Sequence, residues 1–352
     1  MNATTIVQTP ADTSADNPAD TKAGVTSRYT ILERAPFSLR QLALRWESLL
    51  ALLLLAVMLV GGLSLPHFLD PYNLLDGTAN FSEKALIALP MALLIICREI
   101  DISVAGTLAL SSVAMGLAHH AGWPAGYLPL VAIGTGLLCG WLNGYLVTHF
   151  MLPSIVVTIG TVSLYRGLAS VVLGDQAYTN YPQLMADWGQ GQLFDCVPRS
   201  FVILLGAALL FAFVLHATTI GRRLFAIGTN PAAARFSGIA VDRYRLGLFM
   251  LTGAMAGLAA FLLTGRIGST RPNIATGWEL EIITMVILGG VSIAGGAGTI
   301  AGVLLAVLTM GAVTYGLALA NIPGIYMTIV VGVLLLATIA LSRLLRGQPT
   351  RH

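Results

Sequence analysis

The chain has 352 residues, of which 56% are hydrophobic and 10% are charged. Soluble domains carry about 25% charged residues, so a soluble globular protein is excluded and most of the surface must face lipid. The net charge of +3 does not indicate nucleic-acid binding. The three cysteines, Cys97, Cys139 and Cys196, are too few and too scattered for a disulfide framework or a metal cluster.

Residues 1–45 are polar, rich in Thr, Ala and Asp, and hold nine of the charged residues. The first apolar run starts only near Leu49, so this segment lacks the layout of a cleaved signal peptide. A polar segment of this kind, with no long apolar run, is typical of a disordered tail. We therefore expect a largely disordered cytoplasmic tail.

Long apolar runs follow the tail and decide the fold class. They are about 18 to 25 residues long and do not alternate, whereas strands of a membrane barrel alternate over roughly ten residues. The sequence therefore predicts an all-α, polytopic membrane domain over 46–345 with about ten transmembrane helices. The predicted spans are 47–65, 78–98, 102–120, 125–149, 154–174, 199–217, 243–265, 278–293, 299–318 and 323–343.

The basic residues predict the orientation of these spans, because cytoplasmic loops are enriched in Lys and Arg. With the N-terminus inside, 14 of the 19 basic residues fall on the cytoplasmic side. They lie in the N-terminal tail, at Arg98, between Thr218 and Arg245, and at the C-terminus from Arg343 onward. Both termini, including a short C-terminal tail at 346–352, are therefore predicted to be cytoplasmic.

Three charged residues, Arg98, Glu99 and Asp101, separate the second and third predicted spans. Charge inside the hydrocarbon core is costly, so they either form a cytoplasmic turn or line a polar cavity. The turn is favoured because splitting the chain there leaves two helices of membrane length. The segment 96–103 also weakly matches 287–294, at an offset of 191 residues, as the duplicated halves of a transporter would.

Two further polar side chains interrupt apolar spans, Asn143 in the fourth and Arg166 in the fifth. A guanidinium at that depth needs a partner or water, or it extends to the outer surface. Each of the two is therefore either a structural contact or part of a polar transport route. The same alternatives hold for Glu279 and Glu281 at the start of the eighth span.

One substantial loop, 175–198, falls on the side opposite the termini and is predicted to be periplasmic. It carries Asp175, Asp187 and Asp195 together with Trp188, so its character is acidic and aromatic. The sequence offers neither a phosphate-cradling loop of the nucleotide-binding type nor a compact extramembrane domain. Energised transport would therefore need a second chain.

The predicted cytoplasmic loop, 218–242, contains the signal of a short helix. Asn230 can cap a helix, Pro231 suits its first position, an alanine run extends it, and Gly238 ends it. A helix of about two turns is not stable in isolation and normally packs on something. It either lies on lipid headgroups or docks on a cytosolic partner, and we favour the partner.

Glycine-rich segments predict close helix packing and a bend. Gly253 and Gly257 form a GxxxG pair, as do Gly298 and Gly302, and small residues at this spacing let helix backbones approach closely. Five glycines between Gly289 and Gly298 do not favour a straight helix. This run is expected to form a hinge or a re-entrant turn.

Four ordered motifs resemble those of the permease subunits of bacterial ATP-binding-cassette (ABC) sugar importers, over about residues 46–345. This branch includes ribose, arabinose, xylose, rhamnose and autoinducer-2 permeases. The matching segments are Ile100–Val104, similar to the family's GIDLSVG; Gly160–Gly167, similar to its GTxxxxRG; Gly221–Ile239, similar to its GR…A(I/L)GxNxxAAxxSGI; and Glu279–Gly298, similar to its ELxAIAAVVLGGxSxxGGxG. Arg98 and Glu99 replace the usual two glycines and Ala105 replaces another, a charged variant most similar to rhamnose-type and autoinducer-2-type permeases.

The resemblance implies a non-enzymatic, multi-pass subunit of the bacterial inner membrane that imports a sugar, with rhamnose or a similar deoxyhexose or pentose as the leading guess. Its implied partners are a cytosolic ABC ATPase that binds ATP and Mg, a second permease, identical or sister, and a periplasmic sugar-binding protein; this chain would hold no cofactor or metal. The implied ATPase-coupling residues are Arg222, Arg223, Asn230, Pro231, Ala233, Arg235, Ser237 and Gly238. Those of the translocation path or gate are Asp101, Ser103, Asn143, Thr161, Arg166, Glu279, Glu281, Gly289 and Gly290. Those that would contact the binding protein are Asp175, Asp187, Trp188 and Asp195.

Two other functions remain open from the residues alone. A secondary transporter would couple a small polar solute to H⁺ or Na⁺ through membrane carboxylates, and Asp101, Glu279 and Glu281 are the candidates. A membrane enzyme is less well supported, because the pair His119 and His120 stands at a span end without acidic neighbours.

Overall fold

A computed structural model describes residues 46–336, except 175, 194, 195, 324, 325, 327, 328, 331, 334 and 335. All of them belong to the unit Leu42–His352. Both predicted tails and most of the tenth predicted span lie outside the described residues, as do Asp175 and Asp195 of the predicted periplasmic loop.

The described residues are mostly helical, as the apolar runs predict. The helices are α2 (Trp46–Ser64), α3 (Pro71–Gly77), α4 (Ala79–Ile96), α5 (Val104–His120), the 3-10 turn η1 (Ala125–Tyr127), α6 (Leu128–His149), α7 (Ser154–Leu173), α8 (Gln183–Gly189), α9 (Arg199–Ala217), α10 (Thr219–Thr229), α11 (Pro231–Phe236), α12 (Val241–Ile267), α13 (Trp278–Leu288) and α14 (Ile300–Leu319). Two short antiparallel strands, β1 (Gln192–Leu193) and β2 (Val197–Pro198), lie in the loop before α9.

Seven helical segments of the described chain are long and apolar enough to cross a membrane: α2, α4, η1 with α6, α7, α9, α12 and α14. Two other predicted spans form shorter helices, α5 with 17 residues and α13 with 11. The eighth predicted span, 278–293, ends early because Gly290 adopts a φ of 84°, which turns the chain out of the helix. The number of ten spans stays a prediction.

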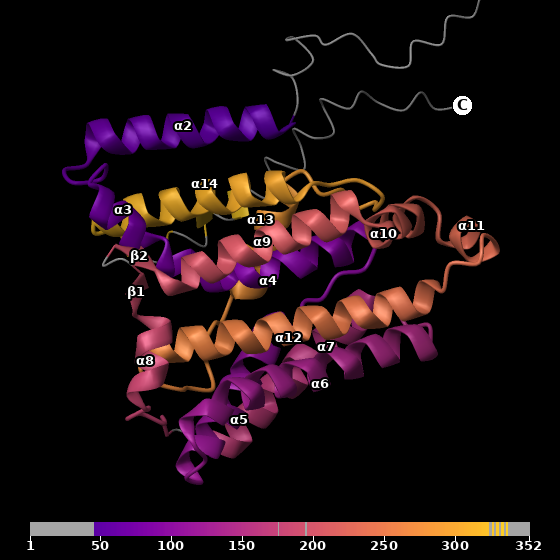
Figure 1. The fold of residues 1–352 in the computed structure, drawn as a ribbon, viewed down its shortest axis with the longest axis horizontal. Coiled ribbons are helices and arrows are strands. Elements are labelled where there is room, and N and C mark those ends of the chain that lie inside the picture. Colours follow the sequence, from indigo (N-terminus) through magenta and orange to yellow (C-terminus); the bar gives the residue numbers. More distant parts are fainter. Residues whose placement is uncertain are drawn as a thin grey trace, which may run out of the picture. The chain divides into compact units, whose positions relative to one another are not determined.

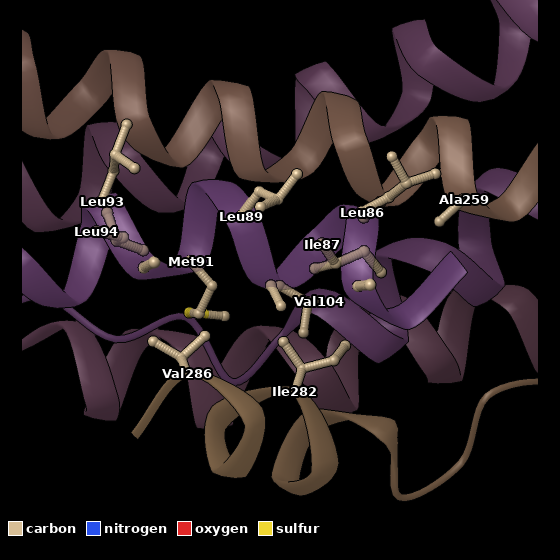
Figure 2. Close-up of a cluster of buried hydrophobic side chains, with 14 of the residues drawn as sticks. Leu86, Ile87, Leu89, Met91, Leu93, Leu94, Val104, Ala259, Ile282 and Val286 are labelled. Atoms are coloured by element: carbon tan, nitrogen blue, oxygen red, sulfur yellow. The ribbon is translucent and has the colours of Figure 1, made fainter. Parts of the chain in front are cut away.

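Helix α4 forms the centre of the core. From Ala85 to Ile96 every residue is buried, whereas α2 buries only Leu50 and Gly61 and lies against α14 (Figure 1). Figure 2 shows side chains of α4 pointing both ways: Leu89 lies on the side of Ala259 in α12, and Met91 faces Val286 in α13. Since lipid supplies no hydrophobic drive between helices, this packing depends on close contact.

Helices α6 and α12 approach closely through facing glycines. A Cβ on Gly136 would lie 2.1 Å from the Gly253 carbonyl oxygen, and one on Gly257 would lie 2.3 Å from the Ala132 oxygen. Any larger side chain there would push the two backbones apart. The packing role predicted for the pair Gly253 and Gly257 is therefore confirmed.

Loops that are far apart in the sequence meet at one end of the helices, which we call the Arg98 end. The turn between α4 and α5 lies there, next to the loop between α13 and α14, because Gly296 N donates to the Ile96 oxygen at 2.9 Å. The start of α7 joins them, since Ile100 N donates to Ser154 Oγ at 3.3 Å. We call the opposite end of α4 the Glu83 end.

Candidate functional site

The candidate site begins at the turn between α4 and α5, residues 97–103. Helix α4 stops because Arg98 N donates to the Ile95 oxygen at 2.9 Å and Glu99 N reaches back to the Leu94 oxygen at 3.1 Å. Arg98 has a φ of 67°, a left-handed conformation that costs energy for any residue other than glycine. The charged side chain is thus held at a position whose backbone would suit a glycine.

The loop after α13 opens with the same hydrogen-bond pattern. Gly290 N donates to the Ile287 oxygen at 2.9 Å and Val291 N to the Val286 oxygen at 3.3 Å, and Gly290 has a φ of 84°. Gly290 therefore corresponds to Arg98, one residue away from the correspondence that the offset of 191 predicts. A duplicated half stays a prediction.

The side chain of Arg98 binds the end of α10. Its Nε donates to the Gly228 carbonyl oxygen at 2.6 Å and its Nη2 to the Thr229 oxygen at 2.7 Å. These are the last carbonyls of α10, where a helix leaves acceptors without partners and carries partial negative charge. The guanidinium thus caps α10 from outside.

Glu99 points to another element, the start of α12. Its Oε1 lies 3.0 Å from Arg245 Nε, an ion pair in which Glu99 is buried and Arg245 is largely so. Burial raises the pKa of the Glu99 carboxyl above its ordinary value, and the hydrogen bond from Ser154 and the charge of Arg245 counteract that rise.

Asp101 starts a buried chain of hydrogen bonds across three helices. Asp101 Oδ1 accepts from Ser103 N at 2.9 Å and from Ser103 Oγ at 2.6 Å. Ser103 Oγ accepts from Asn143 Nδ2 of α6 at 2.7 Å, and Asn143 Oδ1 lies 2.9 Å from the Tyr165 hydroxyl of α7. All four side chains are almost fully buried. We call these four residues the Asp101 network.

The Asp101 network has a single direction. Asn143 donates to Ser103, and Ser103 donates to the Asp101 carboxylate, so each of these bonds polarises the next. The Tyr165 hydroxyl lies 2.9 Å from both Asn143 Oδ1 and the Cys139 carbonyl oxygen, so its one hydrogen is shared between these two acceptors. The network joins α5, α6 and α7 at the Arg98 end. It brings together three predicted path residues and adds Tyr165, which the sequence reasoning missed although it stands inside the singled-out segment 160–167.

Of the other predicted path residues, Thr161 lies beside this network, because its side chain contacts Tyr165 one turn further along α7, whereas Gly289 and Gly290 lie at the end of α13. Thr161 Oγ1 donates within α7, to the Thr158 oxygen at 3.4 Å. Gly289 ends α13, and a Cβ there would lie 2.6 Å from Val303 Cα, which makes it a packing position.

Arg166 ties α7 to the loop before α13. Its Nη1 donates to the Pro272 and Ile274 oxygens at 3.3 Å and to Thr276 Oγ1 at 3.0 Å. It also lines, with Arg271, an open cavity of about 700 Å³. Of the two alternatives for Arg166, these bonds support a structural contact.

Adjacent charges near the start of α4 form ion pairs that the sequence did not reveal. Glu83, fully buried, accepts from Arg266 Nε of α12 at 2.6 Å, and Lys84 pairs with Glu281 of α13. Glu281 is therefore held at the Glu83 end, far along α4 from the Asp101 network. Glu279 Oε2 is buried and has no hydrogen-bond partner among the described residues.

The predicted coupling loop is helical over most of its length. The predicted short helix is present as α11, in which Asn230 Oδ1 accepts from Ala232 N and Ala233 N at 3.1 Å and Pro231 takes the first position. Ser237 and Gly238 follow it.

Helix α10, which carries Arg222 and Arg223, was not predicted. It buries Leu224 and Ile227 and exposes both arginines. Arg223 donates to the Tyr244 hydroxyl at 2.7 Å, and Arg235 of α11 pairs with Asp242 at 2.6 Å.

The predicted contact loop for a binding protein contains α8, β1 and β2. Asp187 accepts from Gln183 within α8 at 3.1 Å, and Trp188 is partly exposed beneath the guanidinium of Arg199. Within the described residues, no three His, Cys, Asp or Glu side chains are placed to hold one metal ion.

Comparison with known proteins places the chain in a family of membrane permeases. Residues 73–339 match the family described as the permease component of branched-chain amino acid transport systems. The chain belongs to this permease family, and with its several apolar helices it is a multi-pass membrane protein.

Individual relatives are import permeases. The chain is 33% identical, over 300 residues, to the autoinducer 2 import system permease protein LsrD of Escherichia coli K12 and to that of Shigella flexneri. The matches cover 84% of this chain and 91% of each relative. These matches confirm the predicted resemblance to the ribose and autoinducer-2 branch of permeases.

One solved structure, described as an inward-facing metal-chelate-type ABC transporter, has a TM-score of 0.46 and 15% identity to this chain. It covers 85% of this chain and 99% of its own. That likeness is too low to establish a shared fold.

Proposed function

We propose that the chain is the membrane-spanning subunit of an ABC importer in the bacterial inner membrane. In this proposal the Arg98 end faces the cytoplasm and α11 docks on a separate ATPase, which binds ATP and Mg. The observation that carries it is the exposed, capped helix α11, whose Phe236 is 94% exposed. Aromatic side chains are enriched at protein–protein interfaces, so Phe236 on this capped helix suits a contact with a partner.

The ATPase contact is argued from how α11 is built. Helix α11 has only six residues, too few to be stable alone, and Asn230 and the Arg235–Asp242 pair hold it in place. Only Ala234 of α11 is buried, so the rest of its surface is free for a partner. Because α10 is joined to both α11 and Arg98, force applied to α11 reaches the helix core.

The proposed substrate is a small, hydroxyl-rich compound of the autoinducer-2 or sugar class. Support comes from the relatives, whose names describe autoinducer-2 import. Rhamnose or a similar deoxyhexose or pentose is the second choice, based on the charged turn at Arg98. A second permease would complete the path, and a periplasmic binding protein would dock on the loop 175–198.

An ion-coupled secondary transporter is the alternative. Two of its three candidate carboxylates already have partners, since Glu281 pairs with Lys84 and Asp101 accepts from Ser103. Uptake that collapses with an uncoupler while ATP is kept constant would favour it over the importer.

The test is co-expression of the full chain with the ATPase and binding protein encoded beside it, followed by reconstitution in liposomes. We expect the ATPase to co-purify and substrate uptake to require ATP. Phe236→Ala should weaken ATPase binding by roughly tenfold or more, since aromatic anchors dominate interfaces.

The matched control is Phe213→Ala, which removes an exposed phenylalanine from α9 within a membrane span. It should leave ATPase binding unchanged. Failure of the wild-type chain to bind any ATPase would contradict the proposal, and unlabelled autoinducer-2, rhamnose and ribose as competitors would rank the substrates.

A further inference from the structure

Three neighbouring charged side chains of the α4–α5 turn contact three different parts of the molecule. Arg98 binds the end of α10, Glu99 pairs with Arg245 at the start of α12, and Asp101 anchors the network of α5, α6 and α7. One short turn therefore contacts α10 and α12 directly and, through the Asp101 network, α5, α6 and α7.

The backbones at this junction are in direct contact. A Cβ on Gly228, near the end of α10, would lie 1.9 Å from the Ile96 oxygen and 2.4 Å from Gly296 N. A Cβ on Gly295 would lie 2.4 Å from Arg98 Cγ. The end of α10, the end of α4 and the glycine loop before α14 thus leave no room between them, and a shift of one displaces the others.

We propose that Arg98 is a positioning residue that transmits the movement of α10 and α11 to the α4–α5 turn and the Asp101 network. This inference rests on the proposed importer function. The guanidinium donates to two successive carbonyls, so it fixes both the position and the direction of the α10 end relative to the turn. Its described bonds here go to neutral acceptors, which a conformational change can exchange without leaving a carboxylate buried and unpaired.

Arg98 is not what keeps α10 folded. Helix α10 is capped at its start by Thr218, whose Oγ1 accepts from Ile220 N at 3.2 Å, and it buries Leu224 and Ile227 against the core. Loss of the Arg98 side chain should therefore leave α10 in place but loosen its link to the turn. The expected defect is one of coupling, with assembly retained.

The test measures substrate imported per ATP hydrolysed by the reconstituted complex of permease, ATPase and binding protein. In Arg98→Ala the ATPase should still co-purify and its hydrolysis rate should stay within about twofold of wild type. The import per ATP should fall by about tenfold, because both charge-assisted hydrogen bonds that link α10 to the turn are lost. Arg98→Lys, which keeps the charge but not the two-pronged geometry, should recover part of the ratio.

Two further variants test whether the contact between Arg98 and α10, and not the loss of a positive charge at this end, determines the ratio. Arg243→Ala removes an exposed arginine at the same end and should leave the ratio unchanged. Gly228→Ala keeps Arg98 but forces α10 away from the Ile96 oxygen, so it should lower the ratio as Arg98→Ala does.

The inference is wrong if Arg98→Ala leaves the ratio of import to hydrolysis unchanged, whether both rates stay at the wild-type level or both fall in proportion. Such a result would contradict the role of Arg98 but not the proposed importer function. Absence of ATPase binding to the wild-type chain would instead contradict the importer function itself. If Arg98→Ala does not assemble, Arg98→Lys and Arg98→Gln carry the same test, and a wild-type ratio in both would overturn the inference.

Discussion

The two ends of α4 both use adjacent charged residues, yet these residues bind different kinds of partner. At the Glu83 end, Glu83 pairs with Arg266 of α12 and Lys84 pairs with Glu281 of α13. At the Arg98 end, Glu99 again pairs with an arginine of α12, but Arg98 holds backbone carbonyls of α10. Both ends join α4 to two neighbours at once.

The difference lies in what remains if a contact opens. Separating Glu83 from Arg266 would leave a fully buried carboxylate without its counter-charge, which is costly in a low-dielectric interior. Separating Arg98 from α10 leaves a half-exposed guanidinium that water can solvate, and two neutral carbonyls. The contact of Arg98 with α10 can therefore be exchanged at lower cost than the Glu83 pair, whereas the buried pair of Glu99 with Arg245 resists opening as the Glu83 pair does.

The largest expected effect comes from breaking the Glu83 pair. Glu83→Ala leaves the Arg266 charge uncompensated, so the free energy of unfolding should drop by about 3 kcal/mol or more. Thermal unfolding of the purified chain in detergent measures this. Asp242→Asn, which opens the exposed pair with Arg235, is the control and should cost less than about 1 kcal/mol.

The double variant Glu83→Ala with Arg266→Ala sharpens this prediction. Removing both charges should recover much of the loss, because the penalty lies in the unpaired charge. Equal losses in the single and the double variant would show that packing, and not charge, holds α4 to α12.

A smaller effect is expected at the neighbouring pair. Lys84 and Glu281 are partly exposed, and Lys84 Nζ also lies 4.8 Å from the centre of the Trp278 ring. Lys84→Met keeps the packing of the side chain but removes both interactions, so the loss should be about 1–2 kcal/mol. Thermal unfolding with and without added salt measures it. A loss as large as that of Glu83→Ala would contradict the ranking by burial.

The sequence alone predicted the helices better than the contacts between them. Apolar runs and the Asn230–Pro231 signal depend on local chemistry, and α4, α9 and α11 lie where these patterns place them. Helix α10 was missed because its two exposed arginines favoured a loop. Its apolar residues Leu224 and Ile227 stabilise it only through burial against the core.

The site could be predicted only in part for the same reason. Asp101, Ser103 and Asn143 stood out as polar residues in an apolar chain, and the structure joins them. The bond from Arg98 to Gly228 and the pair of Glu83 with Arg266 link residues more than a hundred positions apart, which no local pattern encodes. Tyr165 was missed because a tyrosine in a membrane helix is more often an ordinary packing residue.

The smallest expected effect concerns Tyr165. It distinguishes the role of the Asp101 network from the role of the contact between Arg98 and α10. Tyr165→Phe removes the hydroxyl that Asn143 Oδ1 and the Cys139 oxygen share but keeps the ring, so the free energy of unfolding should fall by about 1 kcal/mol. Because the rest of the Asp101 network stays bonded, the substrate imported per ATP should remain near that of wild type, in contrast to Arg98→Ala. Both quantities are measured on the same reconstituted complex. A loss of coupling in Tyr165→Phe as large as in Arg98→Ala would move the coupling role from the turn into the network itself.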